Sequence, residues 1–195
     1  MLLMVMDRKK SIIKGATKSF TLFGYKATTM DQVARISNVG KGTIYTFFEN
    51  KEELFDEIIF SLIEDMRTVA EESIHPERSF FENLHNSLYR VLDFRKKHEL
   101  MMKLTEEVKE LGTPTAQKAM QRVEEEIIHF LKSKVQRAID RGEIKNCDPE
   151  ITAYVMFKLY LSLVFDWEKN HRPLSKEEIA QLFDLYLVHG LVKSE

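Results

Sequence analysis

One short segment of the chain combines positively charged, hydroxyl-bearing and minimal side chains. Lys41 and Lys51 carry ammonium groups that pair with phosphate, and Tyr45 adds a phenol that donates a hydrogen bond. Thr43 offers a hydroxyl for a phosphate oxygen and a methyl group for the methyl of thymine. Gly42 has no side chain, which lets a partner approach the backbone closely. This combination suits contact with the phosphates and base edges of DNA.

Two short helices with a break between them position this segment. Thr29 and Gln32 have the spacing of a capping box, which predicts the start of the first helix. Asn38 and Gly40 tolerate positive φ, so they predict the break. A second helix follows at about residues 41–48. Helices joined in this way form a helix-turn-helix, in which the second helix enters the major groove with its N-terminal residues at the base edges.

A longer helix lies on each side of this pair. The spacing of apolar residues predicts one over about residues 7–23, and Gly24 is a natural stop for it. Asn50 and Glu53 predict the capped start of the next helix, where free N–H groups near Lys51 favour an anion. The small core that anchors the second short helix is expected to contain Ile44, Phe48, Val33, Ile36 and Phe20.

Charge is distributed unevenly along the chain. The net charge is −2, yet residues 1–51 hold nine Lys and Arg against three Asp and Glu, a net +6 that leaves −8 for the remainder. A basic head and an acidic body indicate that only the first part meets a polyanion. Clustering of charges on an ordinary solvated face would produce the same imbalance, so charge alone does not decide between the two.

Composition favours an all-helical globular protein. Hydrophobic residues make up 44% and charged residues 31%, and the 7 Gly and 4 Pro are too few for a chain rich in hairpins. The apolar run at residues 151–167 falls short of the ~20 residues that cross a bilayer. Cys147 is the only cysteine and cannot form an internal disulfide, in keeping with a reducing cytoplasm. We therefore expect a cytoplasmic protein with no membrane segment, and leave open whether translation starts at Met1, Met4 or Met6.

No pattern of enzymatic chemistry stands out in the sequence. The 6 His are scattered, without a metal-binding HExxH motif or a cysteine cluster, so we expect no metal site. The chain also has no glycine-rich phosphate loop and no recognisable Ser/His/Asp or Cys/His framework. We accordingly predict no catalytic residues, no cofactor and no enzymatic activity.

The N-terminal segment resembles the DNA-binding region of the TetR-type repressors. The shared positions, in the family's order and spacing, are Phe23-Gly24-Tyr25, Ala27-Thr28-Thr29, Val33-Ala34, Val39-Gly40-Lys41-Gly42-Thr43-Ile44-Tyr45, Phe48 and Lys51-Glu52-Glu53-Leu54. Two positions depart from the family pattern. Asn38 stands where the family often has Gly, which still permits the turn. Phe47 stands where the family often has His or Tyr, which takes away one polar group that would face DNA.

The resemblance implies an all-α homodimer with two DNA-binding heads and a body that pairs the subunits and binds a small effector. Residues 1–51 would form the DNA-binding helix-turn-helix domain, and residues 52–195 the dimerisation and effector-binding domain. The family's DNA contacts fall on Thr29, Lys41, Gly42, Thr43, Tyr45 and Lys51 of this sequence. Thr46 and Phe47 are outward positions that would differ between operators, and they complete the predicted DNA-binding set.

The body is predicted to consist of longer amphipathic helices. We expect them at residues 77–97, 99–110, 114–141, 149–170 and 175–192, which makes about nine helices in all. The helix at 149–170 is apolar nearly all round apart from Lys158, Ser162 and Asp166, so it must bury more than one face. Burial within one subunit would satisfy this requirement. The family resemblance favours a dimeric four-helix bundle made with the last helix.

An effector pocket is suggested by composition and by the family. The 13 Phe and 9 Met suit an adaptable apolar cavity. The candidate effector-binding residues are Phe94, Met101, Met102, Phe130, Phe157 and Trp167. Plain core packing accounts for the same residues equally well. A buried cavity on the order of a few hundred Å³ would separate the two interpretations.

The sequence therefore predicts a dimeric transcription regulator, a repressor that a small, largely apolar effector releases from double-stranded operator DNA. The alternative is a DNA-bound interaction protein of the same fold that recruits a protein partner without an effector. The residues do not specify the operator sequence, the effector, the regulated genes, or whether the protein represses or activates.

Overall fold

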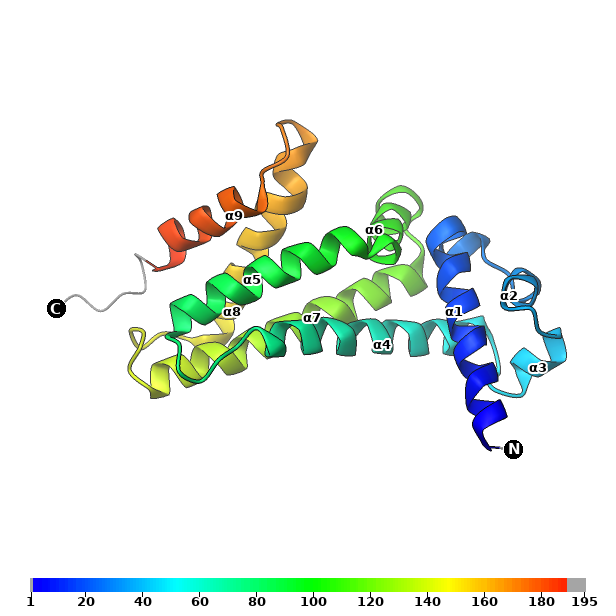
Figure 1. Cartoon of the computed structure of the whole chain (residues 1–195). Helices are drawn as coiled ribbons and strands as arrows, with labels where there is room; N and C mark the ends of the chain where they lie inside the picture. Colours follow the sequence, from blue (N-terminus) through cyan, green and yellow to red (C-terminus); the bar gives the residue numbers. More distant parts are fainter. Residues whose placement is uncertain (1, 189–195) are drawn as a thin grey trace. The chain divides into compact units, whose positions relative to one another are not determined.

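The computed structural model describes the backbone of residues 2–188 and most of their side chains. All regular secondary structure in this range is helical, with nine α-helices and no strand (Figure 1), which confirms the predicted all-α fold. The chain divides into two compact units. The first unit consists of Met1–Glu64 with Lys97–Val123, and the second of Asp65–Lys96 with Glu124–Glu195. The functional division after residue 51 stays a prediction. The compact first unit extends beyond that residue, to Glu64.

The first unit is built around α1 (Leu2–Ala27), which packs against α2 (Met30–Ser37) and α6 (Glu99–Leu111). The short α3 (Lys41–Tyr45) follows α2, and α4 (Lys51–Glu72) begins in this unit (Figure 1). The predicted anchors of the head are confirmed for the most part, since four are buried and one is half-buried. The buried anchors are Phe20, Val33, Ile44 and Phe48, and the half-buried one is Ile36.

The turn chemistry predicted for the head is confirmed, and two helix boundaries are corrected. Thr29 and Gln32 form the capping box that opens α2, and Asn38 ends α2 with a φ of 53°. α1 begins at Leu2 rather than at about residue 7. The predicted stop at Gly24 is confirmed, since Gly24 is non-helical (φ 77°) and only a short helical segment continues beyond it to Ala27. α3 ends at Tyr45 rather than residue 48, because the N–H groups of the next residues fold back onto the Ile44 carbonyl in a tight turn.

The second unit contains α5 (Phe80–Lys97), the later part of α7 (Pro114–Asp140), α8 (Pro149–Leu161) and α9 (Lys176–Phe183). Asp148 caps α8 by accepting hydrogen bonds from two backbone N–H groups, and a capping box of Ser175 opens α9. The buried core of this unit comprises Phe80, Val135, Ala138, Ile144, Met156, Val164, Ile179, Phe183 and Leu187.

Three predicted boundaries in this unit are corrected. The helix expected at 77–97 begins at Phe80, because Ser79 and Glu82 form a capping box that the sequence analysis overlooked. The helix expected at 149–170 ends at Leu161 and continues as wider and tighter turns over Ser162–Asp166 and Trp167–Lys169. The last helix also gives way to a wider turn, over Asp184–Val188, and residues 189–192 of its predicted range lie outside the described residues.

Neither a membrane helix nor a metal cluster is found in the part of the chain that the structure describes. No described helix is long and apolar enough to cross a membrane. No three His, Cys, Asp or Glu side chains of the described residues lie together so that they could hold a metal ion. The Cys147 thiol is free and half-buried.

Candidate DNA-binding surface

α3 is attached to the first unit by one face and presents the other to solvent. Ile44 is fully buried, and Phe48 is 3% exposed. Lys41 and Gly42 are exposed at the start of the helix, and Tyr45 is 47% exposed at its end. The two apolar anchors therefore fix the helix so that its N-terminal residues face outward, as a recognition helix in the major groove requires.

The space in front of Gly42 is open. A Cβ atom added at Gly42 would meet no atom within 4 Å, so packing inside the protein does not require glycine at this position. Gly15 is the opposite case. A Cβ atom there would lie 2.1 Å from the Ser37 Oγ atom and 3.0 Å from the Ser37 Cα atom. Packing within the first unit therefore requires glycine at Gly15, where α1 meets α2, and leaves Gly42 available for the predicted approach to DNA.

We expect Gly42→Ala to weaken DNA binding about 10-fold, because the new methyl group would stand between α3 and the duplex. The free energy of unfolding should stay the same or rise by about 0.5–1 kcal/mol, since alanine favours a helix over glycine. Fluorescence anisotropy with a bound genomic DNA fragment and urea unfolding measure the two quantities. Gly15→Ala is the control, with about 1–3 kcal/mol lost to overpacking. Unchanged DNA affinity of Gly42→Ala would remove Gly42 from the interface.

Lys41 is held at the surface by an ion pair across the turn between α2 and α3. Its Nζ atom lies 2.9 Å from the Asp31 Oδ2 atom, and both side chains are largely exposed. The hydrogen bond that Lys41 donates to Asp31 raises the pKa of Lys41 above its usual value, so the ammonium group stays charged. Exposed pairs of this kind are weak, and a DNA phosphate can replace the Asp31 carboxylate.

The other predicted contacts of this region are partly engaged within the chain. The Thr29 hydroxyl accepts a hydrogen bond from the Gln32 N–H at 3.3 Å and is exposed. Thr46 is also exposed, and its hydroxyl donates to the Thr43 carbonyl at 2.7 Å. Thr43 and Phe47 are half-buried. Of these four positions, Thr29 and Thr46 are therefore the more accessible.

Lys51 supports the end of α1. Its Nζ atom donates to the carbonyl oxygens of Tyr25 at 2.8 Å and Thr28 at 2.9 Å, and it lies 4.3 Å from the centroid of the Tyr25 ring. Burial lowers the pKa of Lys51, and the Glu107 carboxylate opposes that shift. Two of the three ammonium protons are therefore engaged inside the protein, which leaves one for an external acceptor.

Glu107 on α6 is a central residue of this unit that the sequence analysis did not single out. Its side chain is 4% exposed. The Oε2 atom accepts from the Tyr25 N–H at 2.5 Å, and the Oε1 atom accepts from the Lys26 N–H at 2.9 Å. Gly24 provides the room, since a Cβ atom there would lie 2.3 Å from the Glu107 Oε2 atom. No local sequence signal identifies a partner so distant along the chain.

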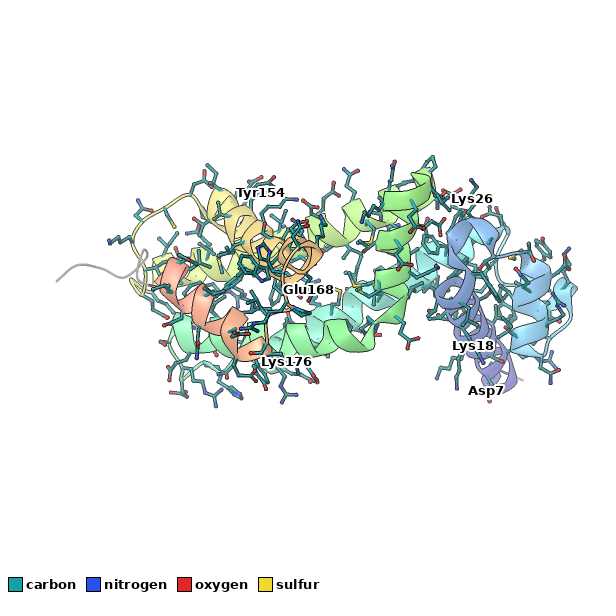
Figure 2. All side chains as sticks on the ribbon, turned by 90° about the horizontal axis from the view of Figure 1, so that it is seen from above. Asp7, Lys18, Lys26, Tyr154, Glu168 and Lys176 are labelled. Atoms are coloured by element: carbon teal, nitrogen blue, oxygen red, sulfur yellow. The ribbon has the colours of Figure 1, made fainter. Side chains whose placement is uncertain are left out.

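Exposed lysines of α1 add positive charge to the first unit. Lys10, Lys14, Lys18 and Lys26 are exposed, and Figure 2 marks Lys18 and Lys26 on α1. Lys9 instead pairs with Glu57 at 2.7 Å. Such a concentration of exposed cations attracts a polyanion over long range and raises the rate of encounter.

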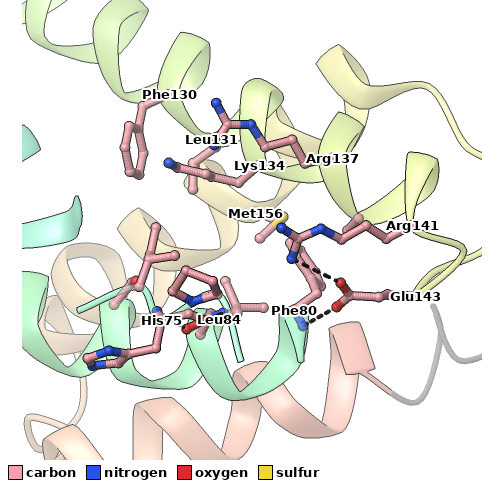
Figure 3. Close-up of a pocket in the computed structure, with 15 residues that line it drawn as sticks. His75, Phe80, Leu84, Phe130, Leu131, Lys134, Arg137, Arg141, Glu143 and Met156 are labelled. Carbon is pink, nitrogen blue, oxygen red and sulfur yellow. Dashed lines mark hydrogen bonds and ion pairs between the residues drawn. The ribbon is translucent and has the colours of Figure 1, made fainter. Parts of the chain in front are cut away.

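The six predicted effector residues are divided between the two units. Met101 and Met102 belong to α6 in the first unit, and the other four belong to the second unit. Phe94 is half-buried, Phe157 is buried, and Trp167 is 40% exposed. A cavity of about 160 Å³ lies in the second unit, and Phe130 is the one residue of the six that lines it (Figure 3). Three cationic residues that the sequence analysis missed, Lys134, Arg137 and Arg141, also line it.

Comparison with known proteins relates the chain to transcription regulators. Residues 12–58 match the family profile described as bacterial regulatory proteins, tetR family. The chain is 56% identical over 188 residues to the uncharacterized HTH-type transcriptional regulator YhgD of Bacillus subtilis (strain 168), which covers 96% of this chain and 98% of that protein. The HTH-type transcriptional regulator HbdR of Aromatoleum sp. (strain CIB) is 37% identical over 71 residues, 36% of this chain and 29% of HbdR.

Solved structures share the fold at low sequence identity. The SmeT–triclosan complex has a TM-score of 0.75 and 16% identity, covering 96% of this chain and 93% of that chain. The reduced form of E. coli NemR has a TM-score of 0.73 and 16% identity, covering 97% of this chain and 98% of that chain. These likenesses concern the helical architecture alone.

Proposed function

This chain belongs to the TetR family of bacterial transcription regulators and is not an enzyme, and on that premise we propose that it is a dimeric repressor that a small ligand releases from operator DNA. The observation that carries the proposal is α3, whose outward face combines a cation, a phenol and an open glycine over two buried anchors. The proposed DNA contacts are Thr29, Lys41, Gly42, Thr43, Tyr45, Thr46, Phe47 and Lys51.

Exposed apolar side chains of the second unit support a dimer interface on α8 and the segment after α9. Ile151, Tyr154 and Val155 on α8 are exposed, as are Leu185 and Tyr186 after α9. Large apolar side chains gathered on particular helices mark an interaction surface more often than a free one. A second copy of the chain that presents the same helices would cover them through a two-fold axis.

A ligand that controls DNA binding is supported by the cavity in the second unit. Its volume of about 160 Å³ is below the few hundred Å³ expected for a typical effector pocket, and it supports a ligand of small size. The SmeT structure of the same fold is a complex with triclosan, in keeping with a small-molecule ligand. α4 is continuous from Lys51 to Glu72 and belongs to both units, so it is the element through which we expect ligand binding to act on the head.

We expect Tyr154→Glu to dissociate the dimer, because a carboxylate would be buried against an apolar partner surface. The wild-type protein should sediment at twice the 22.9 kDa of one chain, and the variant as a single chain at micromolar concentration. DNA affinity should fall by about 100-fold or more, since the two heads no longer bind as one molecule. Leu111→Glu, an exposed apolar position at the end of α6, is the matched control and should stay dimeric. A monomeric wild-type protein that binds DNA with full affinity contradicts the proposal.

A further inference from the structure

The cavity in the second unit combines an apolar lining with cationic side chains (Figure 3). Phe80 and Met156 are buried members of the core, and Leu84 and Phe130 extend the apolar surface. Its volume of about 160 Å³ is close to the roughly 150 Å³ of an apolar cavity that accepts benzene. The space therefore suits a ring or a short aliphatic chain.

The cationic side chains of the lining come from one stretch of the chain. Lys134 and Arg137 lie on α7, and Arg141 follows directly after its end. Residues at i, i+3 and i+7 share one face of a helix, and like charges three or four residues apart destabilise it. This arrangement is unfavourable unless an anion compensates it.

The described carboxylates compensate this charge only in part, since Glu143 pairs with Arg141 alone of the three. Glu143 lines the cavity, but its Oε2 atom accepts a hydrogen bond from the Phe80 N–H and its Oε1 atom lies 3.5 Å from Arg141 (Figure 3). Neither the Lys134 ammonium group nor the Arg137 guanidinium group has a hydrogen bond or an ion pair with another residue in the described range. The Lys134 Nζ atom instead lies 4.5 Å from the centroid of the Phe130 ring. Within the described part of the chain, two positive charges at an apolar cavity therefore lack a carboxylate in ion-pair contact.

The surroundings of Lys134 add to this imbalance. Burial lowers the pKa of Lys134 and the charge of Arg137 lowers it further, while Glu71 opposes the shift. Glu71 is itself paired with Arg67, at 3.7 Å. An anion placed between Lys134 and Arg137 would stabilise the charged form of Lys134 against burial and would offset its repulsion by Arg137.

We propose that this cavity binds a small carboxylate with an apolar body about the size of benzene, such as an aromatic or short aliphatic acid. The ring or chain occupies the space beside Phe80, Leu84 and Met156, and the carboxylate pairs with Lys134 and Arg137. A guanidinium group receives a carboxylate through two parallel hydrogen bonds, which fixes the orientation of the ligand. The inference rests on the proposed function only where it takes this acid to be the ligand that releases the protein from DNA.

Isothermal titration calorimetry of the full-length protein without DNA tests the site. Benzoate and hexanoate serve as probes, with benzamide and hexanamide as neutral analogues and acetate as an anion without an apolar body. We expect saturable binding of one acid per chain, and binding of the amides and of acetate about 10-fold weaker or less. Amides that bind as tightly as the acids, or acetate or inorganic phosphate that binds as tightly as hexanoate, would overturn the proposal.

Two lysine variants of α7 separate the site from general charge effects. Lys134→Met should weaken benzoate binding about 10- to 100-fold, because a hydrogen-bonded charge pair is lost. Lys132→Met is the matched control, since Lys132 pairs with Glu150 at 2.6 Å and does not line the cavity. Lys134→Met should melt no lower than the wild-type protein, as it removes an unpaired charge. If Lys134→Met fails to fold, Arg137→Gln, at an exposed residue, takes its place. The site is refuted if Lys134→Met binds benzoate as tightly as Lys132→Met, or if Arg137→Gln binds it as tightly as the wild-type protein.

Release of DNA is measured separately, so that the site and the function fail independently. Fluorescence anisotropy follows a selected genomic fragment as benzoate or hexanoate is added. Acids that bind in calorimetry but leave DNA bound would refute the ligand-released repressor and leave the site standing. A neutral compound that releases DNA, with no acid bound, would refute the site and leave the repressor standing.

Discussion

Substitution of Glu107 by alanine is expected to lower the free energy of unfolding of the first unit by about 3–5 kcal/mol. The carboxylate is buried, and it accepts hydrogen bonds from two consecutive backbone N–H groups, those of Tyr25 and Lys26. Alanine would leave both N–H groups without their acceptor and would also remove the carboxylate near Lys51. The free energy of unfolding of Glu107→Gln should lie between those of the wild-type protein and Glu107→Ala, because an amide offers only one acceptor oxygen.

Urea unfolding with two probes measures this effect. Circular dichroism follows the helices of both units, whereas the fluorescence of Trp167, the 1 Trp of the chain, follows the second unit. The midpoint of the transition for the first unit should fall in Glu107→Ala while the Trp167 signal moves little. Glu106→Ala is the matched control, since Glu106 is exposed and its carboxylate pairs with Lys103 at 3.3 Å on the surface of the same helix. We expect its stability within about 0.5 kcal/mol of wild type. Equal effects of the two substitutions would show that the buried contact is unimportant.

The same contact makes a prediction about Gly24. Gly24→Ala places a methyl group on a residue with φ of 77° and within 2.3 Å of the Glu107 Oε2 atom, so both backbone strain and loss of the contact follow. In the Glu107→Ala background the clash with the Glu107 carboxylate is absent and only the backbone strain remains, about 1–3 kcal/mol. The two substitutions together should therefore cost less than the sum of their separate effects, which a double-mutant cycle detects.

The local features of the head could be predicted because short-range chemistry determines them. The capping box of Thr29 and Gln32 and the left-handed turn at Asn38 depend on residues that are adjacent in sequence. The burial of Ile44 and Phe48 follows from apolar spacing in the same way. The Ser79 capping box belongs to this class too, and the pattern of Ser79 and Glu82 was available in the sequence.

The contacts that depend on tertiary packing could not be predicted. Lys51 is predicted as a DNA contact from the family pattern. The residues next to it in sequence do not indicate that its ammonium group donates to the carbonyl oxygens of Tyr25 and Thr28. The pairing of Glu107 with α1 joins residues 81 and 82 positions apart. The shared face of Lys134 and Arg137 on α7 could be read from their spacing. That this face meets Phe80 in a cavity required the fold.

Lys41→Gln should reduce the salt dependence of DNA binding, because a lysine that neutralises a phosphate releases a counter-ion. The slope of log affinity against log salt concentration should become shallower by about 0.9 for each head, or roughly two for a dimer. Lys41 is exposed and its ion pair with Asp31 is open to solvent, so stability should hardly change. Lys51→Ala is a poorer test of this kind, since it also removes two hydrogen bonds to the end of α1.

Tyr45→Phe is the counterpart that separates a hydrogen bond from a charge. Tyr45 is 47% exposed on α3, and the substitution removes only its hydroxyl. Affinity should fall about 3- to 10-fold per head with the salt slope unchanged, because a neutral donor releases no counter-ion. Titration of a labelled genomic fragment from 50 to 200 mM salt measures both variants, with Lys145→Gln, an exposed lysine of the second unit, as the control. If Lys41→Gln keeps the wild-type slope and Tyr45→Phe keeps the wild-type affinity, α3 does not contact DNA, however well its anchors place it.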